Sequence, residues 1–260
     1  MLKILKYSFY DLIRSSWSYV YLAFYLLIGF VMLFLNPSLS KAILTLMNVI
    51  IMLVPLIGTV FGVMYYYSSQ EFTELLLALP VKRSSIFFGQ YLGVAISLSL
   101  SLILGLGIPF MIYGLFQSAD IWQFGILLLL GTLLTFIFTG ISYNIALANE
   151  NRIKGFAYAI LVWLFLAVIY DGIFLISLMY FSEYPLDKFS LIASIFNPID
   201  LSRVMMLLKL DISALLGYTG ALFKKFFSAY WGSLIALGIL VIWAVVPILL
   251  LRRKSTRKDF

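Results

Sequence analysis

The sequence predicts an all-α membrane protein with six transmembrane helices and an amphipathic interfacial helix at its N-terminus. Of the 260 residues, 63% are hydrophobic and only 11% are charged, and the mean hydropathy is +1.08. A soluble domain carries about 25% charged residues, so this chain cannot cover a surface that faces water. Its apolar residues form continuous runs, whereas a membrane β-barrel shows short alternating segments. We therefore expect a single transmembrane domain over residues 1–260.

Six apolar runs match, or nearly match, the roughly 20 helical residues that cross a bilayer core. They are Ser18–Leu35, Ala42–Tyr66, Phe87–Leu115, Gln123–Leu147, Phe156–Phe181 and Ser228–Leu251. Before the first run, residues 1–16 place Leu2, Leu5, Phe9 and Leu12 at helical spacing. This pattern predicts an interfacial elbow helix, with an ordinary cytoplasmic tail as the alternative.

Lysines and arginines gather on one side of this six-span plan. That side would hold both termini and the loops after the second and fourth spans. Its basic residues are Lys3, Lys6, Arg14, Lys82, Arg83, Arg152, Lys154, Arg252, Arg253, Lys254, Arg257 and Lys258. The positive-inside rule predicts that both termini lie in the cytoplasm. The net charge of +7 is then a signal of topology and not of nucleic-acid binding.

The residue types present exclude several kinds of chemistry. The chain has no Cys and no His, which excludes thiolate and imidazole metal sites and the nucleophiles of these two types. No phosphate-binding G-x-x-x-x-G-K-[ST] motif occurs, so we expect no ATP site of the P-loop kind in this chain. We predict neither a metal nor a cofactor in this chain, and no catalytic residue. An intramembrane enzyme would depend on Asp171 alone, which disfavours it.

The first cytoplasmic loop, 68–85, predicts a short amphipathic helix. Ser68 or Ser69 can cap its start, acidic residues follow in the first turn, and Pro80 ends it. Its apolar ridge consists of Leu75, Leu76 and Leu79. Such a helix, held beneath the membrane by two spans, suits a lever for a cytoplasmic partner. A plain re-entry at the interface explains the spacing equally well.

Several residues within the spans stand out. The glycine pairs Gly58 with Gly62 and Gly89 with Gly93 have the spacing that lets two helices approach closely. The aromatic residues 65–67 are expected at the membrane interface, where the second span leaves the lipid.

Two polar residues mark the fourth and fifth spans. Asp171 marks either a pathway or partner inside the membrane, or a fifth span that starts late and leaves this carboxylate at the outer interface. Asn144 predicts a hydrogen bond between helices more than a ligand. Both are kept as candidate pathway residues.

A longer segment, 182–227, separates the fifth and sixth spans and is where we expect function. Asn197-Pro198 predicts a helix start, with Pro at the first helical position. Asp211 can cap a second helix, which Gly217 would end. We predict two short amphipathic helices on the outer surface, with apolar faces on lipid or against a partner protein.

The order of these elements, together with Glu71-Phe72-Thr73-Glu74-Leu75-Leu76-Leu77-Ala78-Leu79-Pro80-Val81-Lys82-Arg83, resembles the permease subunit of ABC-2-type transporters. The coupling segment of that superfamily is roughly G-T-x-E-x-L-L-x-x-P-[VI]-x-R, and Phe72 here replaces its glycine. The resemblance implies a type V exporter-like fold. It also implies ATPase-coupling roles for Glu71, Thr73, Glu74, Leu75, Leu79, Pro80, Lys82 and Arg83.

The outer segment resembles, more narrowly, permeases that serve nitrous oxide reductase maturation. The residues that carry this likeness, and for which it implies contact with a periplasmic partner, are Asn197, Pro198, Asp200, Arg203, Asp211, Gly217, Tyr218, Thr219 and Gly220. The resemblance implies a homodimer in the bacterial inner membrane and a cytoplasmic ABC ATPase that holds ATP and Mg. It further implies a periplasmic β-helical partner and a role in assembling a copper–sulfur centre.

Three other functions remain open from the sequence. A general ABC-2 exporter of lipids or drugs would keep the coupling helix but not need the outer motif. An ion-coupled secondary transporter would need ion sites inside the membrane, for which Asp171 is the candidate. A structural scaffold would need neither the coupling helix nor ion sites inside the membrane.

Overall fold

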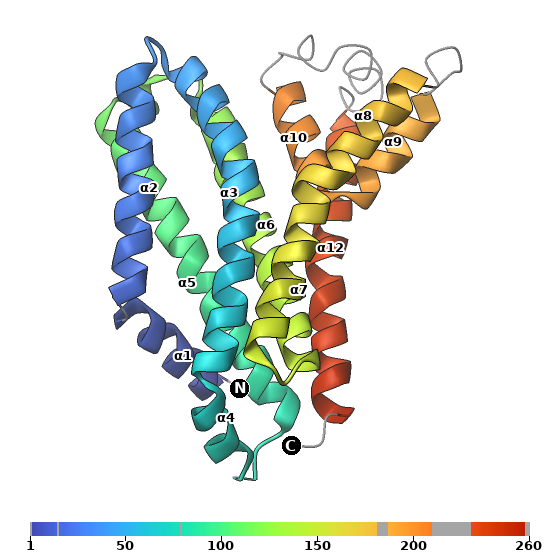
Figure 1. Cartoon of the computed structure of the whole chain (residues 1–260). Helices are drawn as coiled ribbons and strands as arrows, with labels where there is room; N and C mark the ends of the chain where they lie inside the picture. Colours follow the sequence, from blue (N-terminus) through green and yellow to red (C-terminus); the bar gives the residue numbers. More distant parts are fainter. Residues whose placement is uncertain (1, 15, 79, 181–186, 210–229, 258–260) are drawn as a thin grey trace.

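The computed structural model describes residues 2–14, 16–78, 80–180, 187–209 and 230–257. Within these ranges the chain forms helices and no strand, which confirms the predicted all-α class. Six helical stretches among the described residues are long and apolar enough to cross a membrane, as predicted. The start of the first helix and the end of the last lie at the same end of the molecule (Figure 1).

The helices from α1 to α8 follow one another with short connections (Figure 1). In chain order they are α1 (Leu2–Arg14), α2 (Ser16–Leu35), α3 (Leu39–Ser68), α4 (Gln70–Leu77), α5 (Arg83–Ile112), the 3-10 turn η1 (Leu115–Gln117), α6 (Ile121–Ala148), α7 (Arg152–Leu164), the π-helix η2 (Phe165–Ile169), α8 (Tyr170–Tyr180), α9 (Asp187–Phe196), α10 (Pro198–Lys209) and α12 (Tyr230–Arg257). The end of the molecule that carries α4 is called the α4 end, and the opposite one the α10 end.

The predicted amphipathic helix at the N-terminus is present as α1, which packs across the start of α5. It buries Ile4 and Ser8. Gly89 and Gly93 of α5 make this approach possible, because a Cβ at Gly93 would lie 2.7 Å from the Ser8 Cβ and one at Gly89 3.0 Å from Ile4. The predicted role of this glycine pair in close packing is confirmed.

Among the described helices, α3 and α6 form the most extensive contact and the central layer. Here too the glycine pair is what lets the backbones approach. A Cβ at Gly58 would lie 3.2 Å from the Thr139 hydroxyl oxygen, and one at Gly62 would overlap the Ser142 hydroxyl. The small residues of both helices therefore fix their spacing, as the pattern predicts.

The three consecutive tyrosines at the end of α3, which we expect at the level of the membrane interface, pack against other helices. Tyr65, Tyr66 and Tyr67 are all buried between helices. The Tyr67 hydroxyl donates a hydrogen bond to the Asn149 carbonyl at 2.8 Å. Its ring fits because Gly155 has no side chain, and a Cβ there would overlap the phenol. The tyrosines thus join α3 to the loop before α7.

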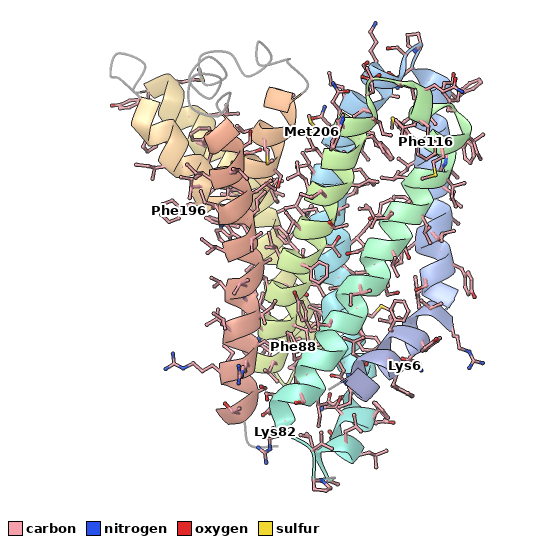
Figure 2. All side chains as sticks on the ribbon, turned by 180° about the vertical axis from the view of Figure 1, so that it is seen from behind. Lys6, Lys82, Phe88, Phe116, Phe196 and Met206 are labelled. Atoms are coloured by element: carbon pink, nitrogen blue, oxygen red, sulfur yellow. The ribbon has the colours of Figure 1, made fainter. Side chains whose placement is uncertain are left out.

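Helix α10 also departs from the prediction, because it lies inside the bundle and not on an outer surface. It packs against α3, α6 and α12. Its residues Ile199, Leu201, Val204, Met205, Met206 and Leu207 are all buried in the larger hydrophobic cluster. These residues surround most of the helix, and a helix that is apolar on nearly all sides is buried. Figure 2 shows Met206 on α10 beside the neighbouring long helices.

The remainder of the 182–227 segment is only partly described. Residues 187–196 form α9, a helix that precedes the predicted start at Asn197-Pro198. The second predicted helix, which begins at Asp211, lies outside the described residues.

Candidate functional site

The first candidate site is the short helix α4, which follows α3 with only Ser69 between them. Ser69 stands at the predicted N-cap position, but its side chain makes no capping hydrogen bond. Its hydroxyl instead donates to the Tyr65 carbonyl at 2.7 Å. The end of α3 and the start of α4 are therefore joined at a bend that holds both helices in a fixed relation.

Helix α4 is fastened to the spans through Thr73. This residue is buried, and its hydroxyl donates to the Ser69 carbonyl at 2.8 Å. The Thr73 hydroxyl oxygen also accepts a hydrogen bond from the Gln90 side-chain amide of α5, at 2.8 Å. A buried side-chain pair of this kind contributes about 1 kcal/mol and fixes geometry. Thr73 therefore positions α4 and is not part of an exposed partner surface.

Phe72, the residue that replaces the consensus glycine, makes a second attachment. Its ring stacks on Tyr7 of α1, with 4.5 Å between ring centroids and 23° between planes. An aromatic pair at this distance adds about 1 kcal/mol to the burial of both rings. In this chain α4 is thus linked to α1 as well as to α3 and α5.

The opposite side of α4 is exposed at the α4 end of the molecule. Glu71 and Glu74 are exposed there, and Leu75 exposes 70% of its surface. Two carboxylates beside an exposed leucine form a small amphipathic surface that nothing in the described chain covers. We call Glu71, Glu74 and Leu75 the α4 surface.

The other predicted coupling residues lie beyond this surface. Leu79 is outside the described residues. Pro80 follows α4 in a bend, and Lys82 occupies the exposed N-cap position of α5, which begins at Arg83.

The second candidate site is an ionic cluster near the α10 end. The Arg203 guanidinium lies 2.6 Å from an Asp171 carboxylate oxygen and 3.2 Å from one of Asp200. Asp171 belongs to α8, whereas Asp200 and Arg203 belong to α10. Asp171 is therefore an ion-pair partner in a bridge between two helices. We call Asp171, Asn197, Asp200 and Arg203 the outer ionic cluster.

Asn197 connects this cluster to the fifth span. Its side-chain carbonyl accepts the Ile199 backbone N–H at 3.1 Å, which caps α10, while Pro198 is the first helical residue as predicted. Its amide donates to Asp200 at 3.0 Å and to the Leu166 carbonyl at 2.8 Å. Leu166 lies in the π-helix η2, whose wider turn disrupts the regular backbone ladder. Nothing in the sequence pattern marks this π-helix.

Burial raises the pKa of the Asp200 carboxyl to about 8. The Asp171 carboxylate adds to the rise, and Arg203 and Asn197 oppose it. One guanidinium cannot neutralise two carboxylates, and it lies closer to Asp171. The cluster therefore favours a proton on Asp200 over a fully ionised pair.

These contacts change the interpretation of the outer motif. Asn197, Pro198 and Asp200 are buried, so they serve contacts within the chain, and their predicted position on an outer surface is wrong. Only the Arg203 side chain is partly exposed in this set, at 33%. Asp211, Gly217, Tyr218, Thr219 and Gly220 lie outside the described residues, so their predicted partner contacts stay predictions.

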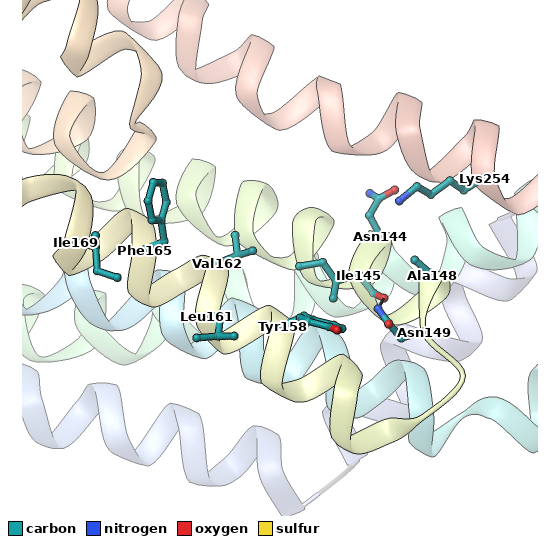
Figure 3. A pocket seen from close by; sticks show the side chains of 10 residues that line it. All are labelled: Asn144, Ile145, Ala148, Asn149, Tyr158, Leu161, Val162, Phe165, Ile169 and Lys254. Carbon is teal, nitrogen blue, oxygen red and sulfur yellow. Dashed lines mark hydrogen bonds between the residues drawn. The ribbon is translucent and has the colours of Figure 1, made fainter. Parts of the chain in front are cut away.

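Asn144 fulfils its predicted hydrogen bond between helices. Its amide donates to the Pro247 carbonyl of α12 at 2.7 Å and to the Gly140 carbonyl at 2.8 Å. The residue also lines a mainly apolar groove of about 540 Å³ between α6, α7 and α12, with Lys254 at one end (Figure 3). In the described part of the chain, no group of three or more carboxylates could hold a metal ion.

The fold and these sites define a multi-pass, all-α membrane protein, and the comparison with known proteins supports an ABC transporter permease. The chain is 25% identical over 218 residues to the "Probable ABC transporter permease protein NosY" of Stutzerimonas stutzeri. The aligned region covers 81% of this chain and 72% of that protein. The resemblance indicated by the two motifs is thereby confirmed. No protein family model matches the chain.

Proposed function

We propose that this protein is the membrane subunit of an ABC transporter in which α4 receives the motion of a separate cytoplasmic ATPase. The observation that carries this proposal is the two-sided character of α4. One side is fixed to α1 and α5 by Phe72 and Thr73, and the other exposes the α4 surface. A helix that is attached firmly to the spans and exposed on its far side can pass a force from a partner into the membrane.

The packing supports a direct route from α4 to the α10 end. Helix α3 is 30 residues long and runs from Leu39 to the bend at Ser69. It packs against α10, and buried residues of both helices share one hydrophobic cluster. Because packed helices move as units, a tilt of α4 would shift α3, and with it α10 and the outer ionic cluster.

At the outer end, the proposed action is on the copper–sulfur centre of nitrous oxide reductase. The likeness to NosY and the outer motif support this part of the proposal. The permease would work as a homodimer with two ATPase subunits that bind ATP and Mg, and with a periplasmic β-helical partner. It would pass a sulfur species, or transmit motion alone, to that partner. Both termini would lie on the cytoplasmic side of a bacterial inner membrane.

The experiment that tests this coupling is the charge reversal Glu74→Lys. Glu74 is exposed, and the hydrogen bond that its carboxylate accepts from the Gln70 side chain is long, at 3.4 Å. The fold should therefore persist in this variant. We expect the variant to lose most of the stimulation of ATP hydrolysis in the assembled complex and to fail in reductase maturation. Glu150→Lys, in the other short loop of the α4 end, is the matched control. If Glu74→Lys and the parent show the same stimulation of ATP hydrolysis and the same reductase maturation, α4 does not receive the motion of the ATPase.

A general ABC-2 exporter is the second candidate, since α4 alone would serve it equally well. Charge reversal at Asp200 or Arg203 does not separate the two, because these residues hold α10 in place. Asp211→Lys is the better variant. Reductase maturation that survives this reversal, with ATPase coupling intact, would favour the general exporter.

A further inference from the structure

A groove between the start of α5 and the end of α12 combines cations, hydroxyls and an apolar floor. It has a volume of about 380 Å³. Lys82 and Arg252 supply the charges, Ser84 and Ser85 the hydroxyls, and Phe88 and Ile248 the apolar floor. This mixture differs from the mainly apolar groove of Figure 3.

Within the described residues, the charges in this groove have no acidic partner. Among the described residues neither Lys82 nor Arg252 has a salt-bridge partner, and no carboxylate lines the groove. The start of α5, a helix of 30 residues, has no side-chain cap here. Its first turn adds a partial positive charge to that of the two side chains. The groove is therefore complementary to an anion.

The groove is polar at one end and apolar at the other. Figure 2 shows Lys82 at the tip of the α4 end, with Phe88 further along α5 toward the middle of the molecule. Leu249 of α12 also lines the groove and is 58% exposed on the outside of the bundle. The apolar part thus continues toward the face that the spans present to lipid.

We propose that this groove binds one anionic phospholipid, with its phosphate between Lys82 and Arg252 and its glycerol oxygens near Ser84 and Ser85. The acyl chains lie over Phe88, Ile248 and Leu249. Basic residues at the end of a membrane span attract anionic headgroups, and here two of them come from different helices. The bound lipid bridges α5 and α12 directly beside the loop that leads from α4. This binding does not depend on the proposed ATPase partner.

Native mass spectrometry of the full-length protein, released from nanodiscs that contain phosphatidylglycerol and phosphatidylcholine, tests the proposal. We expect one phosphatidylglycerol molecule to remain bound to the parent at detergent levels that remove the rest. The double variant K82Q/R252Q should bind it about 30-fold more weakly, because each basic residue contributes about a factor of five. Arg252→Lys keeps the charge and should retain the lipid.

The matched control is K154Q/R253Q, which removes the same charge from exposed positions of the α4 end that do not line the groove. It should keep the bound phosphatidylglycerol. An equal loss in both double variants would mean general attraction to basic residues and would overturn the site. Retention by K82Q/R252Q would overturn it as well, as would loss of the ATPase subunit by this variant with lipid binding unchanged.

Discussion

The Asn197 side chain makes three hydrogen bonds near the α10 end. Its amide and carbonyl cap α10, hold Asp200 and bond the π-helix of the fifth span. The Asn-Pro pair is thus a joint between two helices that are distant in sequence. Together with the Arg203–Asp171 ion pair, Asn197 holds α10 against the fifth span.

We predict that Asn197→Ala lowers the free energy of unfolding by about 3 kcal/mol, because buried partners then lose their hydrogen bonds. The measurement is the midpoint of thermal unfolding of the purified protein. Asn36→Ala is the control, since the partly buried Asn36 side chain donates to the nearby Met32 carbonyl and accepts only a long hydrogen bond, 3.4 Å, from Thr45. Asn36→Ala should lower the free energy of unfolding by about 0.5 kcal/mol or less. Equal effects of the two substitutions would contradict the role of Asn197.

Asp200 gives a prediction for pH dependence. Because its pKa rises from 3.8 to about 8 on folding, the folded protein holds a proton that the unfolded chain releases. The stabilisation is complete below pH 3.8 and is lost as the pH rises to 8. The groups that face this carboxyl are Tyr170, Asp171, Asn197 and Arg203.

We therefore expect the free energy of unfolding to fall between pH 5 and pH 8, by at most about 1.4 kcal/mol per pH unit. Asp200→Asn, which mimics the protonated acid, should show a flatter profile over the same range. Unfolding by denaturant at several pH values measures both. A parent protein that becomes more stable as the pH rises through this range would mean that Arg203 controls the cluster instead.

At the scale of elements, the link between α1, α4 and α5 depends on how closely α1 approaches α5. Gly93 sets that distance. We predict that Gly93→Ala destabilises the protein by about 1 to 2 kcal/mol, since a well-packed contact has no room for another methyl group. Thermal unfolding measures the change.

The control for this prediction lies in the same helix. A Cβ at Gly107 would meet nothing within 4 Å, so Gly107→Ala should stabilise α5 by up to about 1 kcal/mol through helix propensity. The two alanines should thus act in opposite directions. If both stabilise the protein, α1 does not pack on α5 as described.

At the scale of the whole molecule, the sequence was sufficient for features that are local in the chain. Apolar runs predicted the six spans, and small residues four apart predicted the contacts of Gly58 and Gly93. The amphipathic α1 and the helix after Ser69 followed from short patterns and turn residues.

The sequence was not sufficient where distant residues meet. The ion pair of Asp171 with Arg203 and the stacking of Phe72 on Tyr7 depend on tertiary packing. The burial of α10 could not be predicted either, because a short apolar helix suits both a membrane surface and the interior of a bundle. Only its packing against α3, α6 and α12 decides between them.

The central claim is that the α4 surface meets a cytoplasmic ATPase. Since the chain has no Cys, a single cysteine at Leu75 provides a unique cross-linking site in intact membranes. We predict that Leu75→Cys forms a covalent adduct with the ATPase subunit when a short bifunctional reagent is added. Leu35→Cys, equally exposed but at the α10 end, should form none. Absence of the Leu75→Cys adduct in an assembled complex, or equal adducts from both positions, would contradict the account.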